Sequence, residues 1–138
     1  MVSVQAEVLL PGPAAAATAL ALTAPISFWG GVDPKSGLVA DPRHPEKGQS
    51  IAGKVLFVPE TVGSSSAAAI LLELVHAKRA PAAIVLHEPD AILLLGLIVA
   101  KEMGLDTPIA LRLDRDRYGA LNGRQLSVSV AGLICNAD

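Results

Sequence analysis

The sequence predicts one α/β domain with a parallel central sheet and a β-rich N-terminal part. In the second half, short runs rich in Val, Ile and Leu alternate with helical stretches, a pattern typical of strand–helix–strand crossovers around a buried parallel sheet. The first third alternates loosely between apolar and polar residues and is interrupted by Pro and Gly turns. With 138 residues, 51% of them hydrophobic and 17% charged, we expect a single domain over residues 1–138.

The elements follow in order along the chain. Residues 2–10 and 17–29 are extended in character, and glycine, proline and polar residues dominate a long connection from Phe28 to Gly53. Asp90 is the expected N-cap of the second helix and Gly104 its C′ residue. After the connection we expect a strand at 54–58, a helix from Ser65 to Lys78, a strand at 82–86, a helix from Ala91 to Met103, and strands at 108–113 and 126–134.

Charge and composition argue against several classes of protein. The net charge is -2 and the Lys and Arg residues are scattered, so nucleic acid is not an expected partner. The longest apolar run, 91–100, is far shorter than the roughly 20 residues that cross a bilayer, so we expect no membrane span. The N-terminus lacks a positively charged stretch, and Cys135 is the single cysteine, so we expect a cytoplasmic protein without a disulfide. Cys135 alone cannot hold an iron–sulfur cluster or a structural zinc ion, and we interpret it as a packing residue.

Three consecutive serines, Ser64, Ser65 and Ser66, follow Gly63 and precede an apolar helical run. Gly63 permits a sharp turn, and Ser64 or Ser65 is the expected N-cap of the helix. The same position suits negative charge, because a helix N-terminus presents unpaired amides and the positive end of the dipole. That dipole is worth about 0.3 to 1 kcal/mol, too little to make a serine a base near neutral pH. The residues therefore leave two roles open, a helix cap and a hydroxyl that acts with help from elsewhere.

Two further groups of residues are candidates. Gly30 and Gly31 permit backbone conformations closed to other residues, and Asp33 is expected to bond to nearby amides in a tight turn. The three histidines show no metal-ligand spacing, and no metal site is expected in this chain. His44 is the histidine best placed for function because it lies in the long connection, where we expect it to be exposed. His76 falls late in the first helix, where an imidazolium suits the dipole.

An ordered set of short motifs resembles the small subunit of the aconitase X family over residues 25–108. The motifs are G-G-V-D at 30–33, H-P at 44–45, G-K at 53–54, G-S at 63–64, A-P at 80–81 and G-x-x-x-A at 96–100. The resemblance implies a swivelling β/β/α domain that pairs with a large subunit carrying an iron–sulfur cluster. The pair would dehydrate a hydroxylated carboxylic acid, cis-3-hydroxy-L-proline or, in the archaeal type, mevalonate 5-phosphate. It also implies that Ser64 abstracts the proton. We expect the site to be lined by Gly63, Ser65, Gly30, Gly31, Asp33 and His44.

The chain departs from the family pattern at three positions. Val62 stands where an arginine is common, Ala68 where a later serine is usual, and Ala17 where a glycine is usual. We favour cis-3-hydroxy-L-proline over mevalonate 5-phosphate, because no basic residues have been added around the serines for a phosphate. Two alternatives remain, a phosphohistidine carrier domain using His76 and a regulatory subunit that has lost its catalytic environment.

Overall fold

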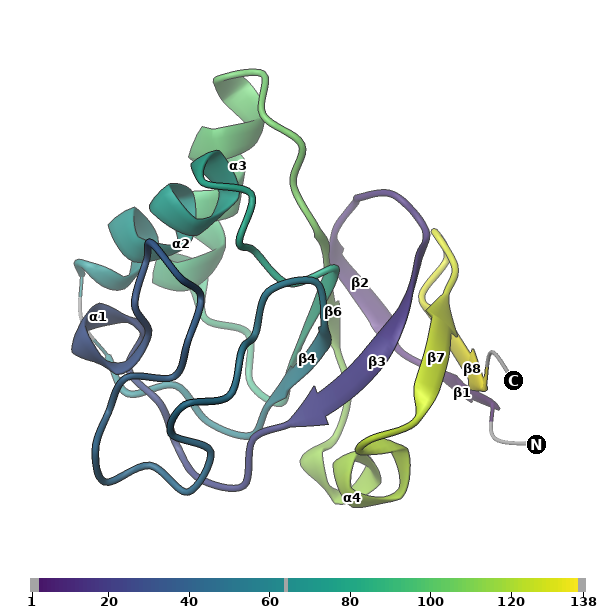
Figure 1. Ribbon diagram of the computed structural model, residues 1–138. Helices are drawn as coiled ribbons and strands as arrows, with labels where there is room; N and C mark the ends of the chain where they lie inside the picture. Colours follow the sequence, from purple (N-terminus) through teal and green to yellow (C-terminus); the bar gives the residue numbers. More distant parts are fainter. Residues whose placement is uncertain (1–2, 64, 137–138) are drawn as a thin grey trace.

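A single sheet organises the protein (Figure 1). The computed structural model describes residues 3–63 and 65–136, and within them eight strands pair in the order β1-β8-β7-β3-β4-β5-β6-β2. The strands are β1 (Ser3–Gln5), β2 (Glu7–Leu10), β3 (Ala15–Ala21), β4 (Val55–Val58), β5 (Ala83–Leu86), β6 (Ile109–Arg112), β7 (Gln125–Val128) and β8 (Leu133–Asn136).

The central strands β3, β4, β5 and β6 are parallel, as the sequence predicts, and the outer pairs are antiparallel. Every residue of β4 and β5 is buried. This explains why their sequences are continuous apolar runs, since a parallel sheet covered on both faces exposes neither side of its strands.

The two edges of the sheet meet. β1 and β2 stand at opposite ends of the strand order, yet only Ala6 separates them in the chain. The first half of this stretch pairs with β8 and the second half with β6, and the Ala6 N–H donates to the Gly132 carbonyl at 2.9 Å. The sheet therefore curls into a barrel-like closure, and its inward side chains form one core, which includes Val55, Phe57 and Leu126.

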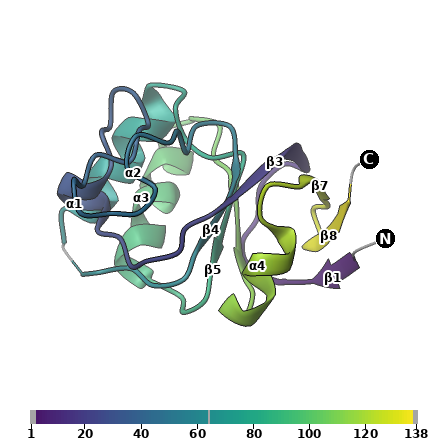
Figure 2. The ribbon, with the colours of Figure 1, turned by 60° about the horizontal axis from the view of Figure 1, so that its bottom comes forward.

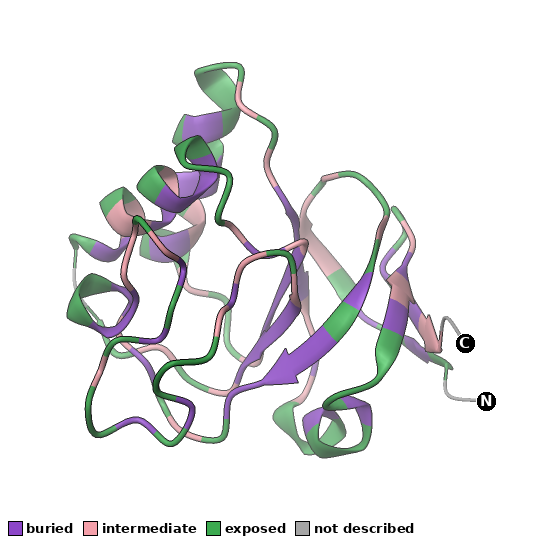
Figure 3. Ribbon diagram, viewed as in Figure 1, coloured by how far each residue is buried: buried purple, intermediate pink, exposed green. Residues whose placement is uncertain are grey.

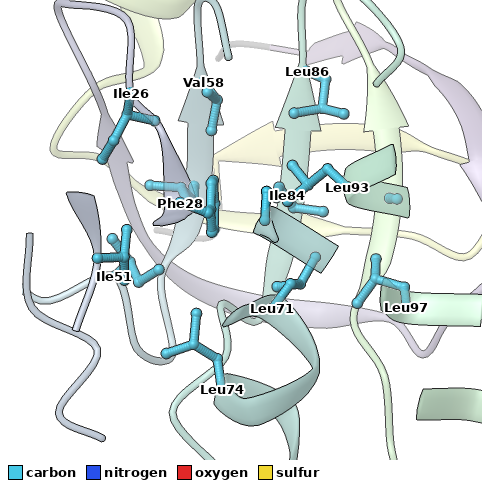
Figure 4. Packing of buried hydrophobic residues seen from close by; sticks show 14 of the residues in the cluster. Ile26, Phe28, Ile51, Val58, Leu71, Leu74, Ile84, Leu86, Leu93 and Leu97 are labelled. Carbon is cyan, nitrogen blue, oxygen red and sulfur yellow. The ribbon is translucent and has the colours of Figure 1, made fainter. Parts of the chain in front are cut away.

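The helices cover the other face of the parallel strands (Figures 1 and 2). The helices α2 (Ala67–His76) and α3 (Ala91–Glu102) lie over the sheet, and the short α1 (Phe28–Gly31) lies beside α2. Figure 4 shows Leu71 and Leu93 of these helices gathered with Ile84 of the sheet in the second core. The 3-10 turn η1 (Arg115–Arg117) and the helix α4 (Tyr118–Leu121) instead close the barrel core, with the Tyr118 ring 5.1 Å from that of Phe57. Figure 3 shows buried residues on both sides of the central strands.

Most predicted elements are confirmed, including the Asp90 cap, which accepts the N–H groups of Ile92 and Leu93, and Gly104 with φ +80°. The single strand predicted at 126–134 is wrong, because Gly132, with φ +88°, makes a turn that divides it into β7 and β8.

The extended segment predicted at 17–29 is wrong beyond Ala21, since its end forms the kinked helical turn α1. The first long helix begins at Ala67 with Ser66 in the N-cap position, not Ser64 or Ser65. The η1 and α4 segments were not predicted because they are too short to show a helical period.

Candidate functional site

The serine segment, residues 59–66, joins the end of β4 to the start of α2. Because β3 to β6 run in one direction, their carboxyl ends lie along one edge, where α/β sheets commonly bind ligands. Ser64, the predicted proton acceptor, lies outside the described residues. Its neighbours Gly63 and Ser65 are both exposed to solvent.

Two sets of contacts hold the start of the serine segment. Ile26 and Thr61 form a parallel bridge, in which the Ile26 N–H donates to the Glu60 carbonyl at 3.1 Å and the Val62 N–H donates to the Ile26 carbonyl at 2.9 Å. On the other side, the Thr61 hydroxyl donates to Asp90 Oδ2 at 2.7 Å. Residues 60–62, at the start of the serine segment, are therefore fixed between the chain that leaves β3 and the N-terminus of α3.

The glycine pair predicted to line the site lies close to the serine segment (Figures 1 and 2). Ile26, which shortly precedes the pair in the chain, forms a bridge with Thr61 of that segment. Gly30 has φ +82° and is exposed, so the backbone itself requires glycine. Gly31 is buried, and a Cβ there would lie 3.1 Å from Cγ1 of Ile26. Trp29 precedes them with 59% of its surface exposed. The neighbouring backbone is thus glycine-rich and open to solvent.

Gly63 differs from both. Its φ is not in the left-handed region, and an added Cβ would meet nothing within 4 Å. The fold of the described residues therefore does not need glycine at this position.

Asp33 serves its own turn, as the sequence predicts. Its Oδ1 accepts the Lys35 N–H at 2.9 Å, and its backbone pairs with Gly37 and Leu38. The Lys35 N–H and the Ser36 hydroxyl hold the pKa of the Asp33 carboxyl below its ordinary value. These contacts explain its presence structurally, and a role in lining the site remains a prediction.

The expectation that His44 is exposed is wrong, because only 1% of its side chain is accessible. Its Nδ1 accepts the Glu46 N–H and its Nε2 donates to the Ala24 carbonyl, both at 3.1 Å. The carboxylate of Glu46 in turn accepts the N–H of Thr23 at 2.6 Å and its hydroxyl at 2.8 Å. His44 and Glu46 therefore hold the chain leading from β3 to Ile26. The Nε2 of His44 contacts that chain, and its Nδ1 accepts within its own loop. A polar loop suggests exposure, but this loop folds back over the chain before it.

Sequence reasoning missed Thr61 and Glu46, and it recognised Asp90 only as a cap. The sequence could have predicted that Thr61 and Asp90 lie near each other. Each follows one of two consecutive parallel strands, and such strands end at the same edge of the sheet. Glu46 gave no comparable signal, since a glutamate in a polar loop is usually solvated.

The described residues form no metal centre. Residues 3–63 and 65–136 contain no group of three or more His, Cys, Asp or Glu side chains placed to hold a metal ion. Cys135 lies on β8, three strands from β4 in the sheet order, with its Sγ 3.7 Å from the Ser3 hydroxyl oxygen. An iron–sulfur cluster takes several thiolates, so these residues do not fit one.

His76 lies in the last turn of α2, at the opposite end of that helix from the serine segment. It lines an open cleft together with Lys78 and Asp106, beside the C-terminal ends of α2 and α3. α2 therefore places no histidine beside the serine segment. Within residues 3–63 and 65–136, no helix combines the length and the apolar character that a membrane span requires.

The fold and the site define a class of protein: a small α/β domain whose sheet curls into a barrel-like closure and which presents a serine segment at the carboxyl edge of its parallel strands. The family is shown by a sequence model described as the aconitase X swivel domain, which matches residues 3–134. The chain belongs to this family.

Its relatives differ greatly in length. The chain is 52% identical over 86 residues to a cis-3-hydroxy-L-proline dehydratase of Pseudomonas aeruginosa, a match covering 62% of this chain and 15% of the relative. It is 36% identical over 115 residues to a protein of the same name from Hypocrea jecorina, covering 78% and 19%. With the phosphomevalonate dehydratase small subunit of Methanothermobacter thermautotrophicus, identity is 40% over 89 residues, covering 64% and 68%. The chain thus spans less than a fifth of the first two relatives and about two thirds of the third.

The structure is similar to the crystal structure of Thermococcus kodakaraensis aconitase X in its holo form. The TM-score is 0.84 at 27% identity, and the match covers the whole of both chains. The expected swivelling α/β fold is therefore confirmed.

Proposed function

We propose that this chain is the small subunit of a dehydratase that removes water from a hydroxylated carboxylic acid, with cis-3-hydroxy-L-proline as the favoured substrate. The observation that carries the proposal is the serine segment, anchored on two sides at the carboxyl edge of the parallel sheet and exposed at Gly63 and Ser65. The relatives named as dehydratases supply the class of reaction.

In this proposal Ser64 acts as its alkoxide and accepts a carbon-bound proton next to the substrate carboxylate. Loss of that proton and of the hydroxyl group as water leaves a carbon–carbon double bond. The N-terminus of α2, two residues beyond Ser65, lies close in the chain and stabilises the negative charge of the alkoxide. Because that dipole is worth only about 0.3 to 1 kcal/mol, further stabilisation of the alkoxide has to come from another chain.

We infer that the second chain is a large subunit that carries an iron–sulfur cluster, which would act as a Lewis acid on the departing hydroxyl. The described residues of this chain do not fit such a cluster. The steps assigned to this chain therefore involve only its own residues. The outer face of α3 supports the existence of a partner, since a helix with so many exposed apolar side chains marks a contact surface. These side chains, here called the α3 outer face, are Ile92, Leu95, Ile98, Val99 and Met103, with 38% to 60% of their surfaces exposed.

The charge of the serine segment supports the choice of substrate. Glu60 is the one charged residue between 59 and 66, and Val62, with 51% of its surface exposed, replaces the arginine common in the family. An acidic segment without a cation suits a substrate that lacks a phosphate. Mevalonate 5-phosphate remains the second candidate, because relatives named phosphomevalonate dehydratase small subunit match over about two thirds of their length.

We propose a cytoplasmic location for the complex.

The test is a complex of this chain with the aconitase X large subunit from the same organism, assayed for dehydration of both substrates. A general base contributes about 100- to 10,000-fold, so Ser64→Ala should reduce kcat by roughly that factor. Ser127→Ala, on β7 on the antiparallel side of the sheet, is the matched control and should retain near-normal turnover. Full activity in Ser64→Ala would contradict the assignment of the base. If the chain then changed only the substrate affinity of the large subunit, the regulatory alternative would replace this proposal.

A further inference from the structure

The carboxylate of Asp90 is shared between two elements. Its Oδ1 accepts the N–H groups of Ile92 and Leu93 at 3.0 and 3.1 Å, which caps α3. Its Oδ2 accepts the hydroxyl of Thr61 at 2.7 Å, from a residue 29 positions earlier in the chain. A helix cap needs only one acceptor oxygen, so the second oxygen serves the serine segment.

The exit of the serine segment is set by the same helix. α2 begins at Ala67, and a Cβ at Gly96 of α3 would lie only 2.5 Å from the Ala68 carbonyl oxygen. The two helices therefore approach closely where the serine segment ends. Asp90 and Gly96 are six residues apart, roughly 9 Å along the axis of α3. One rigid helix thus fixes both the start and the end of the serine segment.

The Thr61–Asp90 bond also has chemical requirements that a simple cap does not share. Asn or Ser would cap α3 as well as Asp. Only a carboxylate offers a second acceptor oxygen after capping, and only Thr or Ser at position 61 offers the hydroxyl donor. A hydrogen bond to a charged acceptor is among the stronger ones available to a side chain.

We propose that Thr61 and Asp90 are positioning residues of the dehydratase site, and that their hydrogen bond fixes the start of the serine segment against α3. This inference rests on the proposed function. A misplacement of about 1 Å in a reacting group can cost roughly 100-fold in rate, so the bond affects turnover by positioning the serine segment.

The experiment uses the complex with the large subunit. Thr61→Val removes the hydroxyl at nearly constant size, and we expect kcat to fall about 10- to 100-fold while KM changes by less than about twofold. Thr61→Ser should restore kcat. Asp90→Ser keeps an oxygen that can cap α3 but has no second oxygen to accept the Thr61 hydroxyl, and it should match Thr61→Val. The double variant should lose no more than either single variant, because both remove the same bond.

The control is Thr18→Val, which removes a comparable threonine bond, 2.8 Å to Gln125 Oε1, on the antiparallel side of the sheet. It should leave kcat unchanged. Amide hydrogen exchange of Val62, whose N–H donates to Ile26, should speed up in Thr61→Val and return to normal in Thr61→Ser. A normal kcat in Thr61→Val, or no rescue by Thr61→Ser, would overturn the proposal even if Ser64→Ala is inactive. Activity in Ser64→Ala would instead overturn the proposed function.

Discussion

Replacing Gly96 with alanine tests the close approach of α2 and α3 most directly. The added Cβ would lie 2.5 Å from the Ala68 carbonyl oxygen and 3.2 Å from its Cα, whereas ordinary contacts begin near 3.4 Å. The obstacle is backbone, which cannot rotate away as a flexible side chain could. The two helices must therefore separate by roughly 1 Å, and such overpacking costs about 1 to 3 kcal/mol, here towards the upper end.

An opposing effect has to be subtracted. Alanine is favoured over glycine inside a helix by about 1 kcal/mol. The net loss in the free energy of unfolding should therefore be about 1 to 2 kcal/mol, which lowers Tm by roughly 3 to 8 °C in a domain of this size. Urea denaturation followed by far-UV circular dichroism is the appropriate assay. Fluorescence is less useful, because Trp29 is already 59% exposed in the folded protein.

Gly119→Ala is the matched control, since Gly119 lies in α4 and an added Cβ there meets nothing within 4 Å. It should be neutral or stabilising by up to about 1 kcal/mol. If Gly96→Ala behaves like Gly119→Ala, the two helices do not approach as closely as described, and the argument that α3 fixes the exit of the serine segment fails with it.

Three further variants test other parts of the structure. Glu46→Ala leaves the N–H and hydroxyl of Thr23 without their acceptor, and it should lower the free energy of unfolding in urea by about 2 to 3 kcal/mol. Tyr118→Phe removes the bond to the Leu113 carbonyl and should cost about 1 kcal/mol at neutral pH. Burial raises the pKa of Tyr118 above its ordinary value of 10.0, so the wild type should lose stability as pH rises past 10.0 and Tyr118→Phe should lose less. Leu95→Lys, on the α3 outer face, should leave Tm unchanged but weaken binding to the large subunit, measured by isothermal titration calorimetry of the two chains.

Each of these has an outcome that contradicts it. An unchanged urea midpoint for Glu46→Ala would mean that the His44 and Glu46 pair does not fasten the chain after β3. Parallel Tm curves for wild type and Tyr118→Phe between pH 8 and 11 would contradict the burial of the tyrosine hydroxyl. Unaltered affinity in Leu95→Lys would show that the partner binds elsewhere.

The parts of the fold that could be predicted depend on neighbours along the chain. The apolar runs at 55–58 and 83–86 indicate buried strands, and Asp90 and Gly104 mark the ends of α3, because periodicity and capping are local. The hairpin of β7 and β8 could not be predicted in the same way. The turn between them, Ser129 to Gly132, contains apolar residues and therefore resembles a continuation of the strand. The serine segment was located for the same local reason, as a glycine and three serines before a helix.

The α/β class, the family resemblance and the position of the serine segment can therefore be predicted from the order of residues along the chain. The residues that hold that segment become visible only in the folded structure. The bond of Thr61 to Asp90 spans 29 positions, and the burial of His44 depends on a loop that folds back over Ala24. Hydrogen-bond partners and burial are set by how distant elements pack, and a residue type indicates only which bonds a side chain is able to make.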